Sequence, residues 1–406
     1  MSKNYKSTLW ACYLGYITQA ITVNLATLFF VIFRKDFGIT YTELGSIVLI
    51  TFVIQIIVDA SMMKLTYVIG YRTSAILAHV FSLVGLVLLG ILPRIMQPFC
   101  GLLISILFYS VGGGMTEVII SPIVDSLPGD AKASGMCLLH SFYSWGQVAV
   151  VLITTVLLKL VGEGLWYIIP PVWAVIPLFN IFMFSRVPLV DIPPEESGSR
   201  ITSYLRTPLI YGAIMLMICG GASEMAMSQW ASLFAESGLG VTKIVGDLLG
   251  PCLFAVNMGI GRTVYGICGK RINMKAALFS CSIFTLTCYM LTVFSGSAVL
   301  SLIGCSLCGL GVSLMWPGVL SMTSSEYGTM TSPALFAFLA LAGDIGCSLG
   351  PWITGKVSDV YIAAGTAASS GGAIRTGLLA ASIFPALMVA VSFIFLIRKR
   401  RTEDLK

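Results

Sequence analysis

The stretch PFCGLLISILFYSVGGGMTEVIISPIV, residues 98–124, decides the fold of this chain. It contains one charged side chain, Glu117, and a helix of this length can cross a bilayer, because spanning needs about 20 mostly apolar residues. Eleven other stretches have the same character. Together they predict twelve transmembrane helices near 9–33, 42–63, 73–92, 98–124, 133–158, 165–185, 208–235, 244–268, 275–294, 298–322, 332–355 and 376–397.

The composition also requires a membrane. Of the 406 residues, 57% are hydrophobic and only 10% are charged, whereas a soluble domain carries about 25% charged residues. A single soluble core stops growing at about 250–300 residues. Lipid must therefore solvate much of the surface, and we expect an all-α integral membrane protein embedded in the lipid bilayer.

The cysteines and histidines do not predict a cofactor or a metal. All 11 cysteines lie within apolar stretches, so no disulfide framework is expected. Cys305 and Cys308 have C-x-x-C spacing, but Gly304 and Gly309 flank them, which favours close helix packing. The chain has two histidines and no phosphate-binding loop. We therefore expect no enzymatic activity.

A polar linker divides the helices into six and six. It contains Pro193, Pro194, Glu195 and Glu196, and it predicts a bundle at 1–190, a cytoplasmic linker at 191–207 and a second bundle at 208–406. The halves repeat: Phe-Gly-Ile-Thr at 37–40 matches Leu-Gly-Val-Thr at 239–242. Parallel repeats of this kind enclose a binding site near the bilayer midplane.

Lysine and arginine predict the orientation. With both termini in the cytoplasm, seventeen of the 24 basic residues face the cytoplasm, which agrees with the positive-inside rule. The others are Arg34, Lys35, Arg94, Lys159, Lys243, Lys356 and Arg375. The net charge of +6 thus reflects orientation in the cytoplasmic membrane, and we expect no binding of nucleic acid.

Three carboxylates, Glu117, Glu224 and Asp344, lie within predicted helices without a Lys or Arg nearby in sequence. An ionised carboxylate at the bilayer centre costs roughly 2.5–3.5 kcal/mol on insertion scales, so these acids predict a site that couples transport to a proton or a sodium ion. Each has a serine four residues later, whose hydroxyl can bond to either protonation state. The alternative is a protonated carboxyl that bonds to a neighbouring helix. Arg262 and Lys64, near cytoplasmic helix ends, are expected to extend to the membrane surface.

Polar and aromatic side chains predict the substrate site. One face of the fifth helix carries His140, Tyr143, Ser144 and Gln147, which suits a polyhydroxy solute or, alternatively, a hydrogen-bonded seam between helices. Trp145, Trp230 and Trp316 lie well inside helices and could stack on a sugar, with ordinary packing as the alternative. We expect Asp59, Lys64, Arg72 and Arg262 to belong to a gate or to anchor loops.

The loop Met63–Arg72 resembles a degraded copy of the G-x-x-x-D-R-x-G-R-R signature of the major facilitator superfamily, with Tyr67 at the Asp position. Glu117 after a glycine run, Leu-His-Ser-Phe at 139–142 and Gly261-Arg262 resemble its fucose-permease-like branch. In that branch a Glu in helix 4 and an Asp in helix 1 bind sugar and couple protons. Helix 1 here offers only Gln19, Asn24 and Thr27, so the second coupling role passes to Glu224 or Asp344.

The resemblance implies a monomeric secondary transporter that moves a small polar solute, with a sugar as the first choice, by proton-coupled alternating access. Two alternatives stay open. One is a proton-coupled efflux antiporter for amphipathic compounds, and the other is a carrier of a different solute, such as an organic acid or a nucleoside.

Overall fold

The computed structural model describes residues 5–127, 131–190, 207–268, 273–327, 333–365 and 370–397, and within these ranges all regular structure is helical. The N-terminal half contains α1 (Lys6–Asn24), η1 (Ala26–Phe29), α2 (Phe30–Phe37), α3 (Tyr41–Ile69), α4 (Tyr71–Ile95), α5 (Pro98–Asp125), α6 (Ala131–Val161), η2 (Glu163–Ile168), α7 (Ile169–Trp173) and α8 (Val175–Arg186).

The C-terminal half contains α10 (Pro208–Leu233), η3 (Phe234–Gly238), α11 (Lys243–Asp247), η4 (Leu248–Cys252), α12 (Leu253–Cys268), α13 (Met274–Phe294), α14 (Ala298–Val312), α15 (Met315–Tyr327), α16 (Pro333–Ala363), α17 (Ser370–Ala381) and α18 (Ile383–Ile397). Of the predicted linker, residues 191–206 lie outside the described part of the chain.

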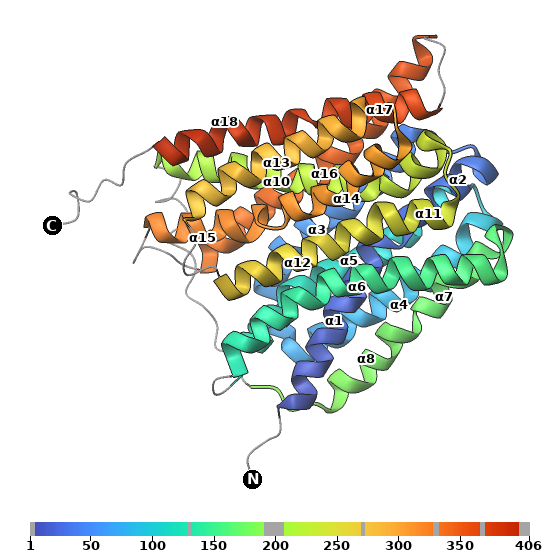
Figure 1. The fold of residues 1–406 in the computed structure, drawn as a ribbon. Helices are drawn as coiled ribbons and strands as arrows, with labels where there is room; N and C mark the ends of the chain where they lie inside the picture. Colours follow the sequence, from blue (N-terminus) through green and yellow to red (C-terminus); the bar gives the residue numbers. More distant parts are fainter. Residues whose placement is uncertain are drawn as a thin grey trace.

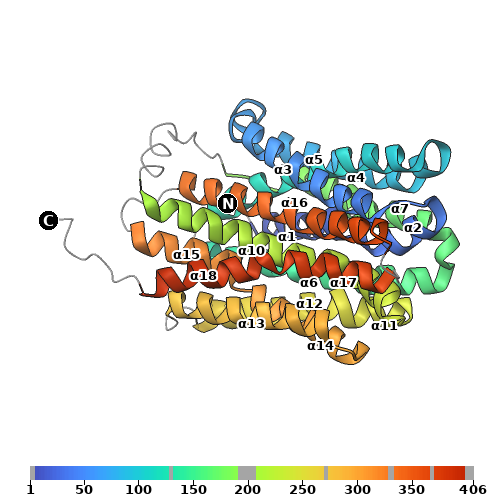
Figure 2. The ribbon, with the colours of Figure 1, turned by 90° about the horizontal axis from the view of Figure 1, so that it is seen from above.

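The helices form one bundle (Figures 1 and 2). We call the end where α1 begins and α18 ends the terminal end, and the opposite end, where α2 leads into α3, the distal end. In Figure 2 the terminal end, with the C-terminus, is on the left.

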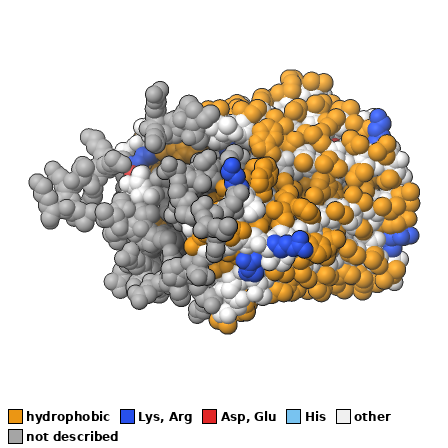
Figure 3. Space-filling view, turned by 90° about the horizontal axis from the view of Figure 1, so that it is seen from below, with side chains coloured by type: hydrophobic (Ala, Val, Ile, Leu, Met, Phe, Trp, Pro, Cys, Tyr) orange, Lys and Arg blue, Asp and Glu red, His pale blue; other side chains and the backbone are white. Residues whose placement is uncertain are grey.

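Eleven helices in the described residues are long and apolar enough to cross a membrane. The remaining predicted span, at 332–355, corresponds to α16, which carries Asp344, Lys356 and Asp359. Hydrophobic side chains cover much of the described surface in Figure 3, and few Lys and Arg side chains are visible among them. The prediction of an all-α membrane protein is confirmed.

Several predicted spans are broken helices. The span predicted at 9–33 divides into α1, η1 and α2. Here Asn24 Nδ2 donates to Ala20 O at 2.9 Å, and Thr27 Oγ1 donates to Asn24 O at 2.9 Å. Such side chains compete with the helical backbone for its carbonyls and favour a local change of geometry.

The two halves repeat the same turn after their first helix. Gly38 and Gly240 both have left-handed φ, +67° and +69°. Gly38 N bonds to Arg34 O, and Gly240 N bonds to Glu236 O, so each glycine ends its helix in the same way. A left-handed residue at this position favours glycine, which has no Cβ to clash.

The repeat extends to helix packing within each half. A Cβ at Gly146 of α6 would meet Ala20 Cβ of α1 at 3.0 Å, and a Cβ at Gly346 of α16 would meet Ile218 O of α10 at 2.0 Å. The fifth helix of each half thus crosses the first at a glycine, where the missing side chain allows close approach.

The hydrophobic core has three parts. One lies in the N-terminal half and includes Cys12 and Ile119, and one lies in the C-terminal half and includes Cys219 and Cys305. The third draws on both halves and includes Phe30 with Trp230, whose rings lie 5.9 Å apart. Because it gathers residues near the distal end, the two halves share a packed core there.

Close backbone contact between α3 and α16 seals this distal interface. A Cβ at Gly45 would lie 2.9 Å from Pro351 O, and a Cβ at Gly355 would lie 2.2 Å from Tyr41 O. The Asp359 carboxylate, on α16, accepts hydrogen bonds from the backbone N–H groups of Tyr41 and Thr42 at the start of α3.

Candidate functional site

The most constrained carboxylate is Glu117 on α5. Its Oε2 accepts hydrogen bonds from Gln19 Nε2 of α1 at 2.6 Å and from Gln55 Nε2 of α3 at 3.3 Å. Three helices therefore converge on one carboxylate oxygen, and Gln19, a predicted substrate-site residue, is one of its two partners.

The glycine run before Glu117 allows this convergence. A Cβ at Gly113 would lie 2.9 Å from Thr22 Oγ1 of α1, and a Cβ at Gly114 would lie 3.2 Å from Gln55 Cα of α3. Larger side chains at these positions would push α1 and α3 away from α5. The run therefore sets the distance that lets both amides reach Glu117.

A second group of acids lies between the halves. Asp344 on α16 and Asp59 on α3 are both close enough to interact electrostatically with Glu117, and with each other. Asp344 is only 4% exposed. In the described residues it has neither a hydrogen-bond nor an ion-pair partner. The site thus gathers three carboxylates from both halves.

Glu224 has a cation partner. Arg262 Nη2 of α12 lies 3.4 Å from Glu224 Oε2 of α10, and Arg262 Nη1 donates to Ser144 Oγ of α6 at 3.3 Å. The expectation that Arg262 extends to the membrane surface is therefore wrong, and Glu224, which has no basic residue nearby in sequence, finds one in the fold. Proximity in the fold, which sequence separation hides, explains the pair.

Two amides also join the halves. Gln229 Nε2 of α10 donates to Asn24 Oδ1 of α1 at 3.2 Å. Tyr143 of α6 lies beside Asn24 and within electrostatic range of Glu224 and Arg262. Asn24, Tyr143 and Ser144, predicted separately from two helices, are thus brought together.

Several buried polar atoms around these residues lack partners among the described residues. Most are acceptors, Gln19 Oε1, Gln55 Oε1, Gln229 Oε1 and Asp59 Oδ1, and one is a donor, Arg262 Nε. Unpaired buried polar atoms are costly, so this region suits an occupant with hydrogen-bond donors. The described residues contain no group of three or more His, Cys, Asp and Glu side chains that could hold a metal ion.

The serines four residues after the acids do not bond to them. Ser121 Oγ lies 2.9 Å from the Tyr16 hydroxyl, and Ser348 Oγ donates to Ile345 O at 2.7 Å. Ser228 Oγ contacts Met225 Sδ at 4.0 Å. The predicted serine–carboxylate pairing is wrong, because each hydroxyl finds a nearer acceptor or donor.

The three interior tryptophans differ in their surroundings. Trp230 is fully buried in the distal interface and donates from Nε1 to Pro351 O at 3.1 Å. Trp316 is half-buried, with its ring against Gly343, next to Asp344. Trp145 is 48% exposed. Trp316 thus contacts the backbone directly beside an acid.

The remaining predicted residues fall into three groups. The side chains of His140 and Lys64 lie outside the described residues. Gln147 is buried on α6, on the same face of the helix as Tyr143 and Ser144. Arg72 donates to Phe184 O at 2.6 Å and to Val187 O at 2.8 Å, so it anchors the end of α8.

The sequence did not predict a buried polar cluster around Asp247, which lies between α11 and α6 at the distal end. Asp247 of α11 accepts hydrogen bonds from Ser232 and from Thr155 of α6, and it pairs with Lys243 at 3.1 Å. The i, i+4 spacing of Lys243 and Asp247 was the available signal. Thr155 adds a further hydrogen bond between the halves at the distal end.

Two six-helix halves, an interior carboxylate held by amides, and polar groups shared between the halves define a multi-pass membrane transporter. The chain belongs to the Major Facilitator Superfamily, whose sequence profile matches residues 12–351. As a member of this family of transporters, it is not an enzyme.

Solved transporters share the fold. The E. coli fucose:proton symporter has 16% identity and a TM-score of 0.66, with 97% of this chain and 98% of that chain covered. A D-xylose–proton symporter has 13% identity and a TM-score of 0.77, with 98% of each chain covered. The nucleoside transporter NupG has 12% identity and a TM-score of 0.73, with 97% and 99% covered. No curated protein sequence gives a significant match.

Proposed function

We propose that this protein moves a small polar solute, with a sugar as the first choice, across the cytoplasmic membrane by proton-coupled alternating access. The observation that carries the proposal is the Glu117 carboxylate, which Gln19 and Gln55 hold between three helices. In similarly folded relatives the solutes are fucose, xylose and nucleosides.

The chemistry of the site favours a hydroxyl-rich solute. The unpartnered oxygens of Gln19, Gln55 and Gln229 can accept hydrogen bonds from sugar hydroxyls. The half-buried ring of Trp316, beside Asp344, offers an apolar face against which a sugar ring could pack. In this proposal Asn24, His140, Tyr143, Ser144, Gln147 and the tryptophans Trp145 and Trp230 complete the substrate site.

Coupling in this proposal uses the acids. Asp344 and Glu117 come from different halves and lie near each other without a cation between them in the described residues. Burial disfavours two charges there, so a proton or a sodium ion bound between them supports closure of the halves. Glu224 serves this role less directly, because Arg262 already balances its charge.

Alternating access then means rocking of residues 1–190 against residues 208–406. The distal contacts support a form closed at that end. With both termini in the cytoplasm, as the basic residues favour, this form faces the cytoplasm. A single copy of the chain supplies both halves, so we expect it to act as a monomer.

One observation favours a second candidate, an organic acid. Arg262 Nε is buried without a partner in the described residues, and a guanidinium with a free N–H can bind a carboxylate. The counterflow assay described next includes organic acids and so distinguishes this candidate from a sugar.

Counterflow in proteoliposomes tests the proposal. Vesicles loaded with a panel of unlabelled sugars, nucleosides and organic acids would be diluted into the labelled solute. We expect a sugar to give accumulation in the wild type and none in Glu117→Gln. Accumulation only with organic acids or nucleosides would replace the sugar assignment, and a fully active Glu117→Gln would remove Glu117 from the site.

A further inference from the structure

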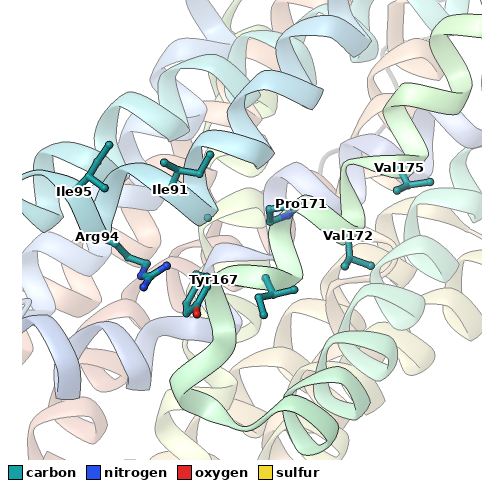
Figure 4. Close-up of a pocket in the computed structure, with 9 residues that line it drawn as sticks. Ile91, Arg94, Ile95, Tyr167, Pro171, Val172 and Val175 are labelled. Atoms are coloured by element: carbon teal, nitrogen blue, oxygen red, sulfur yellow. The ribbon is translucent and has the colours of Figure 1, made fainter.

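A groove on the lateral surface of the N-terminal half has the features of a lipid site. It lies between the distal part of α4 and the η2–α7–α8 segment, and its lining includes Ile91, Arg94, Ile95, Tyr167, Val172 and Val175. In Figure 4, Arg94 lies beside Tyr167, and the apolar side chains of both helices flank the groove.

The groove is apolar along its length and basic at one end. Ile95 is 72% exposed and Val175 is 58% exposed, which suits contact with lipid chains. Arg94 lies near the end of α4, which terminates at Ile95. Arginine and tyrosine at a helix end are typical of the headgroup level of a membrane.

The floor of the groove is a close helix contact. A Cβ at Gly90 would lie 2.4 Å from Tyr167 O and 2.9 Å from Pro171 Cδ. From Arg94 the groove continues along Ile91 on one wall and along Val172 and Val175 on the other, toward the middle of the membrane. An acyl chain that starts at a headgroup beside Arg94 would follow this direction.

The guanidinium of Arg94 is free to bind an anion. It stacks over the Tyr167 ring at 3.7 Å, and no described carboxylate pairs with it. At the same end, Lys35 pairs with Glu163, and Arg375 donates to Val293 O and Ser295 O. The stacking holds the guanidinium in place, and its planar fork matches two phosphate oxygens.

We propose that this groove binds an anionic phospholipid, with the phosphate on Arg94 and one acyl chain along Ile91, Val172 and Val175. Both walls belong to the N-terminal half, so the lipid moves with that half during transport. The site is separate from the acids between the halves, and its occupancy does not depend on the transported solute.

Native mass spectrometry of the full chain tests the site, with phosphatidylglycerol and phosphatidylcholine of identical acyl chains as probes. We expect several-fold more bound phosphatidylglycerol than phosphatidylcholine in the wild type. Arg94→Ala should reduce phosphatidylglycerol to the phosphatidylcholine level. Lys159→Ala removes an exposed cation on the neighbouring α6 that does not line the groove, and it should change nothing.

Two further variants locate the binding. Arg94→Lys keeps the charge but loses the planar guanidinium. The amount of bound phosphatidylglycerol should therefore lie between the amounts bound by the wild type and by Arg94→Ala. Val172→Trp fills the apolar part and should reduce both lipids. Equal retention of the two lipids by the wild type, or equal losses in Arg94→Ala and Lys159→Ala, would overturn the proposal in favour of unspecific surface binding.

Discussion

Asp359 binds the beginning of the helix that contains Thr42, across the boundary between the two halves. Thr42 N donates to Asp359 Oδ2 at 2.6 Å, and Tyr41 N donates to Oδ1 at 3.2 Å. The first N–H groups of a helix have no partner within it, and its N-terminus carries partial positive charge. A carboxylate from α16 therefore completes α3 only while the distal end is closed.

Asp359→Asn should shift the protein toward a form open at the distal end. Asparagine keeps one acceptor but loses the charge, which weakens the bond by about 1 kcal/mol for a partly exposed group. That corresponds to roughly a fivefold change in population. Spin labels at the exposed Asp36 and Ala363, in a cysteine-free background, would report longer distances between the halves.

Glu43→Gln is the matched control for this experiment. Glu43 caps the same helix through Thr40, within one half. It should leave the distances between the halves unchanged. If Asp359→Asn and Glu43→Gln give the same distance distribution, the Asp359 contact does not hold the distal end closed.

Glu117→Gln should abolish uphill uptake while the protein stays folded. Glutamine keeps the size of the side chain and can still bond to Gln19 and Gln55, but it cannot release a proton. The measurement is accumulation of the solute in proteoliposomes under an imposed proton gradient. Accumulation at the wild-type level would mean that Glu117 neither couples nor binds.

Asp344→Asn should separate exchange from uphill transport. Its carboxylate has no partner among the described residues, so neutralising it removes a buried charge and should also raise the melting temperature. Exchange of labelled for unlabelled solute should persist, while net uptake against a gradient fails. Unchanged uphill uptake with an unchanged pH profile would make Asp344 a structural residue.

Arg262→Ala should destabilise the protein more than the double variant Arg262→Ala/Glu224→Gln. Removal of Arg262 leaves Glu224 buried without its cation, which costs roughly 2–4 kcal/mol. The second change removes the stranded charge. Thermal unfolding in detergent measures both variants, and equal losses in the two would show that the pair contributes through packing alone.

Gly346→Ala should be destabilising by about 1–3 kcal/mol, because its Cβ would lie 2.0 Å from Ile218 O. Gly164→Ala is the control, since a Cβ there meets nothing within 4 Å. The comparison is again thermal unfolding. A Gly346→Ala protein as stable as Gly164→Ala would mean that α16 and α10 can move apart without cost.

The fold could be predicted from sequence because every helix that crosses a membrane must be about 20 residues long and mostly apolar. The matching glycines at 38 and 240 also showed the repeat. Partners could not be predicted in the same way. Arg262 and Glu224 are 38 residues apart, and only the fold of the C-terminal half brings their side chains together.

Local spacing was also misleading at the serines. Ser121 shares a helical face with Glu117, but the Tyr16 hydroxyl from α1 reaches it. Asp359 gave no signal, because its partner is a backbone terminus whose side chains carry no matching charge. A contact between a side chain and the end of a helix in the other half cannot be predicted from spacing along the sequence.

The glycine contact at Gly45 makes α3 a lever. From Gly45 to the end of α3 at Ile69, a rise of 1.5 Å per residue gives an arm of roughly 36 Å. A rigid-body rotation of about 15° pivoting there would carry the far tip through roughly 9 Å. A pivot at Gly45 and Gly355, which have no side chains, would thus convert a small rotation at one membrane face into an opening at the other. That opening would be about as wide as a monosaccharide.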